Sequence, residues 1–149
     1  MKKVLTYFLL FCCTCSASAQ KKPLDHSVYD SWQDITNAQL TTDGNYLLYE
    51  VNPQDGDGTL VVRRLSDGKE LIAPRGYQAQ VAQNCHTACI KIKAPFDKIR
   101  QARNKNTSKE DMPKDSLAWI NLDQMSILKY ELIKSYKTGL DNQNFIAYI

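Results

Sequence analysis

AQLTTDGNYLLYEVNP, residues 38–53, is the stretch that decides the fold, because a related stretch begins 41 residues later. That second stretch is AQVAQNCHTACIKIKAP, starting at Ala79. The alternating apolar positions of the two copies also align, with Leu47, Tyr49 and Val51 matching Ala88, Ile90 and Ile92. Alternation with a period of two is typical of β-strands with one buried face. The repeat therefore predicts two copies of one β-sheet unit.

The first unit reads as four short strands joined by tight turns. Asp43-Gly44 and Asp67-Gly68 each lie between two apolar runs. Such pairs accept the positive φ of a tight hairpin turn, so neighbouring strands should be antiparallel. The predicted strands are residues 37–41, 45–52, 59–65 and 69–73.

The second unit follows the same plan but carries an insertion. Its predicted strands are residues 78–82, 86–93, 117–122 and 126–133. Residues 94–115 separate the middle two and are rich in Lys, Arg, Asp and Asn. Phe96–Ala102 is expected to form a short helix, and residues 103–115 a solvated loop whose charges mark an exposed face.

A third unit begins near Ser135, where NFIAY at 144–148 matches NYLLY at 45–49. Four-stranded repeats of about 40 residues are the signature of a β-propeller. The predicted fold class is all-β, with about two and a third antiparallel blades of an incomplete β-propeller. The blades would span about 37–73, 78–133 and 135–149, the third ending inside a strand. The alternative is a small complete sandwich of about ten strands.

The N-terminus reads as a secretory signal peptide, residues 1–19. Lys2 and Lys3 precede an apolar run, Val4–Cys15, and Ala17-Ser18-Ala19 offers a cleavage site. A membrane-anchor helix is the alternative, but twelve apolar residues cover only about 18 Å of a core of about 30 Å. A lipoprotein signal is disfavoured because the cysteines of this region lack the usual preceding residues. We therefore expect export to the periplasm or beyond, without a stable membrane span after cleavage.

Charge and motifs exclude several functions. The formal net charge of +3 falls to +1 when residues 1–19 are removed, which gives no basis for a nucleic-acid partner. No two of the six glycines are four residues apart, so the Gly-x-Ser-x-Gly elbow of α/β-hydrolases is absent. The only histidines, His26 and His86, have no flanking pattern of a general base or a His-Glu-x-x-His zinc motif. We predict no catalytic, metal or cofactor-binding residue, and no cofactor.

Two short motifs contain residues that could bind a metal ion or form a disulfide. Asp55-Gly56-Asp57-Gly58 resembles part of a calcium loop, but an EF-hand would need acids where Pro53 and Arg64 stand. We read it as a loop between strands.

Cys85-His86-Thr87-Ala88-Cys89 could supply a disulfide or metal ligands. Along a strand, four residues span about 13 Å, whereas a disulfide needs a Cα separation of about 5.5 Å. A disulfide between Cys85 and Cys89 therefore requires a turn at 85–87. The simpler interpretation is a turn Cys85 and a partly buried Cys89.

Aromatic residues are spread as the cores of blades require, and we expect packing roles for them. They are Tyr29, Trp32, Tyr46, Tyr49, Trp119 and Tyr148.

A run of phrases resembles the N-terminal part of exported bacterial serine peptidases of the prolyl oligopeptidase family. The phrases are KKPLDHSVYDSWQDI, TTDGNYLLYEVNPQDGDGTLVVR, PRGY, KIKAPFDKIRQARNK, DMPKDSLAWINL and IKSYKTG, between about Lys21 and Ile149. The family pairs an N-terminal β-propeller, which limits the peptides that reach the serine, with a C-terminal α/β-hydrolase domain. The resemblance thus implies a substrate-gating propeller fragment whose partners are peptide substrate, through the full-length enzyme, and the missing hydrolase domain.

No position of this chain matches the family's catalytic Ser, Asp or His, so we expect the chain alone to be inactive. Two other hypotheses stay open. One is a non-catalytic exported propeller-like module that binds a peptide, glycan or protein. The other is a degenerate product without a stable fold, because a partial propeller leaves an unpaired blade edge.

Overall fold

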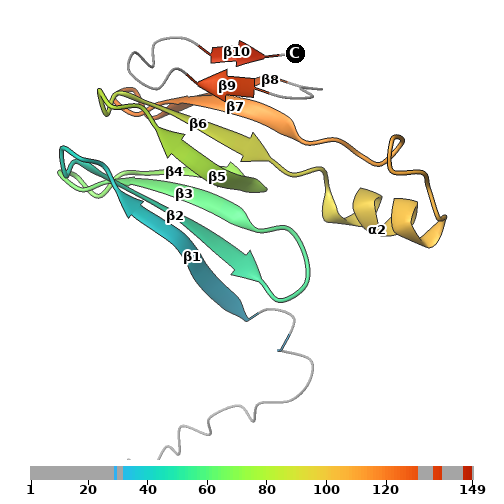
Figure 1. The fold of residues 1–149 in the computed structure, drawn as a ribbon. Helices are drawn as coiled ribbons and strands as arrows, with labels where there is room; N and C mark the ends of the chain where they lie inside the picture. Colours follow the sequence, from blue (N-terminus) through green and yellow to red (C-terminus); the bar gives the residue numbers. More distant parts are fainter. Residues whose placement is uncertain (1–28, 30–31, 131–135, 139–145, 149) are drawn as a thin grey trace, which may run out of the picture.

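Two four-stranded antiparallel sheets packed face to face form most of the molecule (Figure 1). The structure is a computed structural model that describes residues 29, 32–130, 136–138 and 146–148. The predicted signal peptide, residues 1–19, lies outside these residues, as does most of the predicted third blade.

Each sheet is a meander of strands that follow one another in the sequence. The first contains β1 (Gln33–Leu40), β2 (Tyr46–Pro53), β3 (Thr59–Arg64) and β4 (Glu70–Pro74). The second contains β5 (Gly76–Val81), β6 (Thr87–Ile92), β7 (Ser116–Asn121) and β8 (Ser126–Tyr130), with helix α2 (Phe96–Asn104) between β6 and β7.

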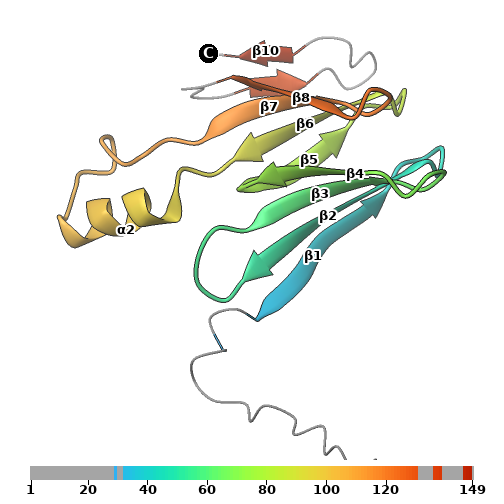
Figure 2. The same cartoon turned by 180° about the vertical axis from the view of Figure 1, so that it is seen from behind.

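A third pair of strands, β9 (Tyr136–Thr138) and β10 (Ile146–Tyr148), is antiparallel. It lies on the side of the second sheet that faces away from the first, as Figures 1 and 2 show from opposite directions. No strand of the described part crosses from one four-stranded sheet into the other. Successive meanders stacked in this way confirm an all-β fold of propeller-like blades.

The 41-residue repeat of the sequence is also a repeat of backbone geometry. Gln39 pairs with Leu48 in the first sheet, and Gln80 pairs with Cys89 in the second. Both first strands shift register just before these pairs, and the residue at the bulge has a positive φ in each, 51° at Asn37 and 49° at Gln78.

The bulges explain why the first strand of each blade starts earlier than the sequence predicts. β1 begins at Gln33 rather than 37, and β5 at Gly76 rather than 78. A bulge adds one residue to one strand and reverses the faces that later side chains occupy. Residues before the bulge are therefore out of phase with the alternation that marks the rest of the strand.

The core lies between the two sheets. The largest fully buried side chains come from both sides: Leu48, Leu60 and Val62 from the first sheet, and Ile90, Ile120 and Leu122 from the second sheet and its β7–β8 turn. Complete burial of such a side chain contributes about 1.5–3 kcal/mol. The two sheets thus stabilise each other through a dry aliphatic layer.

One residue, Arg75, connects β4 to β5 and so joins the two blades. The next residue, Gly76, lies where the backbones approach closely. A Cβ there would be 2.9 Å from Leu60 Cβ and 3.0 Å from the Ala73 carbonyl oxygen. Neither atom lies at the end of a flexible side chain, so the position requires glycine.

No helix within the described residues is both long enough and apolar enough to cross a lipid bilayer. The helix in the insertion begins at Phe96 as predicted and runs two residues further, to Asn104.

We expect Gly76→Ala to lower the free energy of unfolding by about 1–3 kcal/mol, since an added methyl group there overpacks a close contact. Gly44→Asn is the matched control. Nothing lies within 4 Å of a Cβ at Gly44, and asparagine tolerates its φ of +72°. Chemical denaturation of both variants checks this, and equal stabilities would show that the blades can separate slightly at Gly76 without cost.

Candidate functional site

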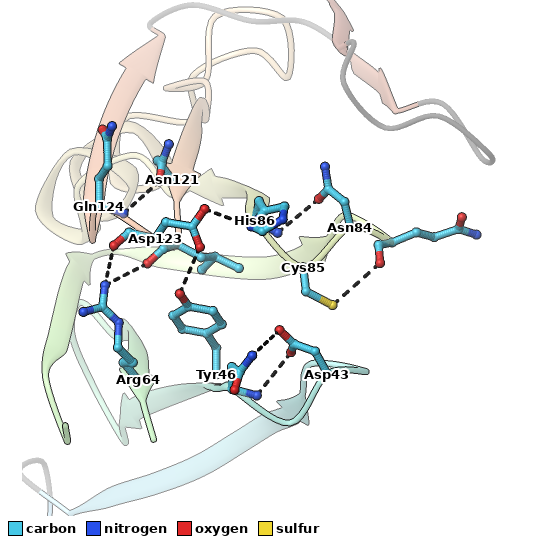
Figure 3. Close-up of polar contacts among 12 residues, drawn as sticks. Asp43, Tyr46, Arg64, Asn84, Cys85, His86, Asn121, Asp123 and Gln124 are labelled. Atoms are coloured by element: carbon cyan, nitrogen blue, oxygen red, sulfur yellow. Dashed lines mark hydrogen bonds and ion pairs between the residues drawn. The ribbon is translucent and has the colours of Figure 1, made fainter. Parts of the chain in front are cut away.

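A cluster of polar side chains joins the two sheets at the end where the β1–β2, β5–β6 and β7–β8 turns meet. We call Tyr46, Arg64, His86 and Asp123 the turn cluster (Figure 3). Tyr46 begins β2 and Arg64 ends β3, whereas His86 directly precedes β6 and Asp123 lies in the β7–β8 turn. The cluster therefore takes two residues from each blade.

Asp123 is the centre of the turn cluster. Tyr46 Oη donates to Asp123 Oδ1 at 3.2 Å, and His86 Nδ1 lies 2.8 Å from Asp123 Oδ2. Arg64 Nη2 donates to the carbonyl oxygens of Asp123 and Leu122, and its Nη1 pairs with Asp67 Oδ2 at 3.2 Å. The carboxylate and the backbone of one turn residue thus bind both side chains of the first blade.

Burial distinguishes the members of the turn cluster. The Tyr46 side chain is buried, and this burial raises the pKa of its hydroxyl, against the hydrogen bond with Arg64, which lowers it. His86 and Asp123 are 64% and 54% exposed, so solvent screens their attraction. Tyr46 is therefore the buried member of the cluster, whereas the side chains of His86 and Asp123 are largely exposed.

A histidine paired with an aspartate provides two of the three members of a catalytic triad, with the carboxylate orienting the imidazole. A nucleophile beside the other ring nitrogen would complete it. Within residues 32–130, no serine, threonine or cysteine side chain hydrogen-bonds the His86 imidazole. The arrangement can hold two blades together, and it lacks the group that would attack a substrate.

Cys85 takes the place of Gly44 in the repeat, as its alignment predicts. Its φ is 55°, and its N–H donates to Ala82 O as the Gly44 N–H donates to Thr41 O, both at 2.9 Å. The Cys85 Sγ lies 3.0 Å from Thr42 Oγ1 of the first blade. Cys85 is thus a turn residue that also contacts the neighbouring blade.

Cys89 lies in β6, and both cysteines are buried free thiols, so the pair that the sequence offers for a disulfide is not joined in this structure. Burial raises the pKa of the Cys89 thiol to about 11, against a lowering by the charge of Lys91. A thiol of this kind is a poor nucleophile at neutral pH.

At the opposite end of the sheets, the Asp55–Gly58 loop binds the insertion of the second blade. Asp57 Oδ1 accepts a hydrogen bond from the Phe96 N–H at 3.0 Å, which satisfies a free donor in the first turn of α2. Asp55 Oδ2 lies 3.8 Å from Arg100 Nη1 on the same helix. The loop is therefore a loop between strands, as predicted, and it also caps a helix of the next blade.

The two ends of the insertion are held together by Asp115. Its Oδ1 accepts from the Ala94 N–H at 3.1 Å, and its Oδ2 accepts from Tyr77 Oη at 2.5 Å. Lys93 Nζ lies 5.1 Å from the centre of the Tyr77 ring. Sequence reasoning missed these contacts, because the only signal was an acid at the last position of a charged insertion.

The aromatic residues with predicted packing roles differ in burial: Tyr49 and Trp119 are half-buried, and the side chain of Tyr148 lies outside the described part of the chain. Tyr46 is buried, in agreement with a packing role. Tyr29 and Trp32 are 39% and 48% exposed and pack edge to face on each other, with ring centres 4.9 Å apart. For these two, the expected role in the core is wrong: they lie just before β1, an edge strand, where the Gln54 N–H of the β2–β3 loop donates to the Trp32 carbonyl oxygen at 3.1 Å.

No group of three or more His, Cys, Asp or Glu side chains in the described part of the chain is arranged to hold a metal ion. Cys85 Sγ contacts Thr42, whereas Cys89 lies in β6 with its backbone opposite Trp119 of β7.

Comparison with solved structures finds a similar fold in an acylaminoacyl peptidase from Pyrococcus horikoshii, with a TM-score of 0.50 and 12% sequence identity. The match covers 77% of this chain and 17% of the peptidase chain, so this chain spans a small part of that protein's length. A second match is an acylaminoacyl peptidase in complex with Z-Gly-Gly-Phe-chloromethyl ketone, with a TM-score of 0.49, 12% identity, and coverage of 75% and 16%. No family model and no curated protein matches the sequence.

Cys89→Ala should change how stability depends on pH. The thiol's pKa is about 11 in the folded chain against an ordinary 9.0, so the unfolded chain releases this proton first as pH rises. The free energy of unfolding of the wild type therefore falls between about pH 9 and 11. The free energy of unfolding of the wild type should therefore approach that of the variant between about pH 9 and 11, as measured by denaturation curves at each pH. A difference between the two proteins that stays constant over this pH range would contradict the prediction.

Asp57→Ala should loosen the start of α2. Loss of an N-terminal cap costs about 1 kcal/mol, which corresponds to roughly five-fold faster amide hydrogen exchange in the first turn. Asp55→Ala is the matched control, since it removes only an exposed ion pair with Arg100 and should leave exchange nearly unchanged. Equal effects of the two variants would mean that the loop acts through its net charge and not through the cap.

Proposed function

We propose that this chain is part of the β-propeller of a serine peptidase of the prolyl oligopeptidase family, where the propeller restricts which peptides reach the catalytic serine. The observation that carries the proposal is the pair of stacked four-stranded meanders, whose fold resembles the propeller region of an acylaminoacyl peptidase. The phrases of sequence between Lys21 and Ile149 independently support the same family.

A gate must hold its shape against the peptides that it rejects, and the contacts between the blades suit this role. The aliphatic layer around Leu48 and Ile90 is dry, and Gly76 lets the backbones approach closely. Asp123 at one end and Asp57 at the other add hydrogen bonds from one blade to the next. Two blades that are joined at both ends of their interface would form a rigid part of the propeller.

Chemistry in this proposal belongs to a hydrolase domain outside these residues. Acyl transfer needs a nucleophile, a base and an oxyanion hole. The chain offers the His86–Asp123 pair but no hydroxyl or thiol at that imidazole within the described residues. The substrate class is a peptide, and the similarity to acylaminoacyl peptidases suggests an acylaminoacyl peptide.

Export completes the proposal. The leader at residues 1–19, with its two lysines, apolar run and Ala-Ser-Ala site, supports secretion to the periplasm or outside the cell. A peptidase in that location would act on peptides that enter from the surroundings.

A second candidate is a non-catalytic exported module that binds a peptide or glycan. The Tyr29–Trp32 pair favours it, because the two rings are 39% and 48% exposed, and Tyr and Trp side chains are enriched at binding interfaces. In this case the chain would bind its ligand without any hydrolase domain.

Labelling with a fluorophosphonate probe distinguishes the candidates. The native polypeptide that contains these residues should react at one serine and should lose the signal after pretreatment with phenylmethylsulfonyl fluoride. Residues 20–149 alone should show no labelling, since they lack the nucleophile elbow. A labelled 20–149 chain would overturn the proposed division of roles, and an unlabelled native polypeptide that binds peptide would favour the second candidate.

A further inference from the structure

The insertion of the second blade begins with a concentration of positive charge. Residues 91–105 hold six basic side chains and one acid, Asp97, a formal charge of +5, whereas the whole chain carries +3. The rest of the chain is therefore slightly negative. The positive charge is gathered on helix α2 and around the end of β6 that leads into it.

Helix α2 takes no part in the buried core. None of its nine residues is buried, and Figures 1 and 2 show it beyond the ends of the strands, where it covers neither sheet. A helix of this length is at best marginally stable by itself in water. Contacts from the first blade hold it instead: Asp57 Oδ1 accepts the Phe96 N–H, and Asp55 Oδ2 lies 3.8 Å from Arg100 Nη1. The fold thus positions a helix that the core does not need.

Three of the charges on and beside α2 are not neutralised. Lys98, Arg103 and Lys105 are exposed, and none of them pairs with a carboxylate of the described residues. The helix dipole favours cations at Arg103 and Lys105, at its C-terminal end, but disfavours a cation at Lys98, in the first turn. The stability of the helix therefore gives no reason for Lys98.

Lys98 and Lys105, which directly follows α2, lie on one side of the helix. They are seven residues apart, about two turns, which corresponds to about 10 Å along the axis. Gln101 lies between them and is also exposed. We call Lys98, Gln101 and Lys105 the basic stripe. Three residues of an extended peptide also span about 10 Å, so carboxylates with this spacing would reach both ammonium groups.

We propose that the basic stripe binds an acidic segment of a peptide, through ion pairs with two carboxylates that are about three residues apart. The inference rests on the proposed function for the peptide as the ligand, and it adds a preference for acidic peptides to the gate. The amide of Gln101 is available to the peptide backbone between the two carboxylates. Positive charge on the gate also raises the rate at which acidic peptides meet it.

A lipid surface fits this helix less well. Helices that lie in a membrane interface expose an apolar face. The apolar residues of α2 are Phe96, Ile99 and Ala102, and all three are half-buried. The exposed residues of α2 are all polar or charged. The helix therefore offers charges without the apolar anchor that a membrane requires.

Peptide binding to the native polypeptide that contains these residues tests the proposal. The probes are a blocked, fluorescent alanine hexapeptide with glutamates at its second and fifth residues, and the same peptide with glutamines there. The protein is first treated with phenylmethylsulfonyl fluoride, so that hydrolysis does not interfere. In fluorescence anisotropy the glutamate peptide should bind about ten-fold more tightly, and the difference should shrink in about 0.5 M salt.

Substitutions locate the binding. Lys98→Gln and Lys105→Gln should each weaken binding of the glutamate peptide about three-fold, and together about ten-fold, without affecting the glutamine peptide. Lys98→Arg keeps the charge and should keep the affinity. Lys69→Gln is the matched control, because it removes the same charge from the exposed β3–β4 turn at the other end of the sheets. It should leave the affinity unchanged.

Several outcomes would overturn the proposal. One is equal affinity of the native polypeptide for the two peptides. Another is an equal loss of affinity in Lys69→Gln, because net charge alone would then attract the peptide. Co-sedimentation with phosphatidylglycerol vesicles that Lys98→Gln abolishes, without a preference between the peptides, would reassign the surface to a membrane.

The same measurements separate this proposal from the peptidase. A preference for the glutamate peptide that depends on Lys98, in a polypeptide that a fluorophosphonate does not label, would support the acidic-peptide site and reject the peptidase. A labelled polypeptide without the preference would support the peptidase and reject the site.

Discussion

Everything in this structure depends on one close contact, the packing of the second sheet on the first through Gly76. A four-stranded antiparallel sheet with apolar side chains on both faces cannot bury them alone. The single-residue link at Arg75 brings the next sheet directly onto the first, and the missing side chain at Gly76 lets the two approach closely enough for Leu60 and Ala73 to be excluded from water. The aliphatic layer then supplies most of the stabilisation.

The polar contacts add orientation to this packing. Asp123 binds Tyr46 and Arg64 at the turn end, and Asp57 caps α2 at the other end. Each contact is partly exposed and so contributes about 1 kcal/mol or less on its own. Acting at both ends of the same interface, they oppose sliding or rotation of one blade against the other, which the non-directional hydrophobic layer resists less well.

The two copies of the blade differ at some positions that contact a neighbouring blade. Cys85 stands at the position of the second blade that is equivalent to Gly44. It has a positive φ like Gly44, and its sulfur contacts Thr42 of the preceding blade. Lys91 stands at the position equivalent to Glu50, although the Glu50 carboxylate accepts a hydrogen bond from the Gln78 N–H at the bulge of the next blade. The face of the first sheet that carries Glu50 and the face of the second sheet that carries Lys91 are therefore not chemically equivalent.

The sequence by itself determined the strands, the turns, the helix and the repeat, since these depend on residues close together in the chain. Alternation around Tyr49 and Ile90 marked the middle strands, and Asp-Gly pairs marked the turns. Only the tertiary structure decided the contacts that join distant segments: the bulges at Asn37 and Gln78, the burial of Glu50, and the Asp57 cap on a helix 39 residues away. It also decided that Tyr29 and Trp32 stay at the surface. These outcomes depend on which sheet faces which, and no local pattern of residues carries that information.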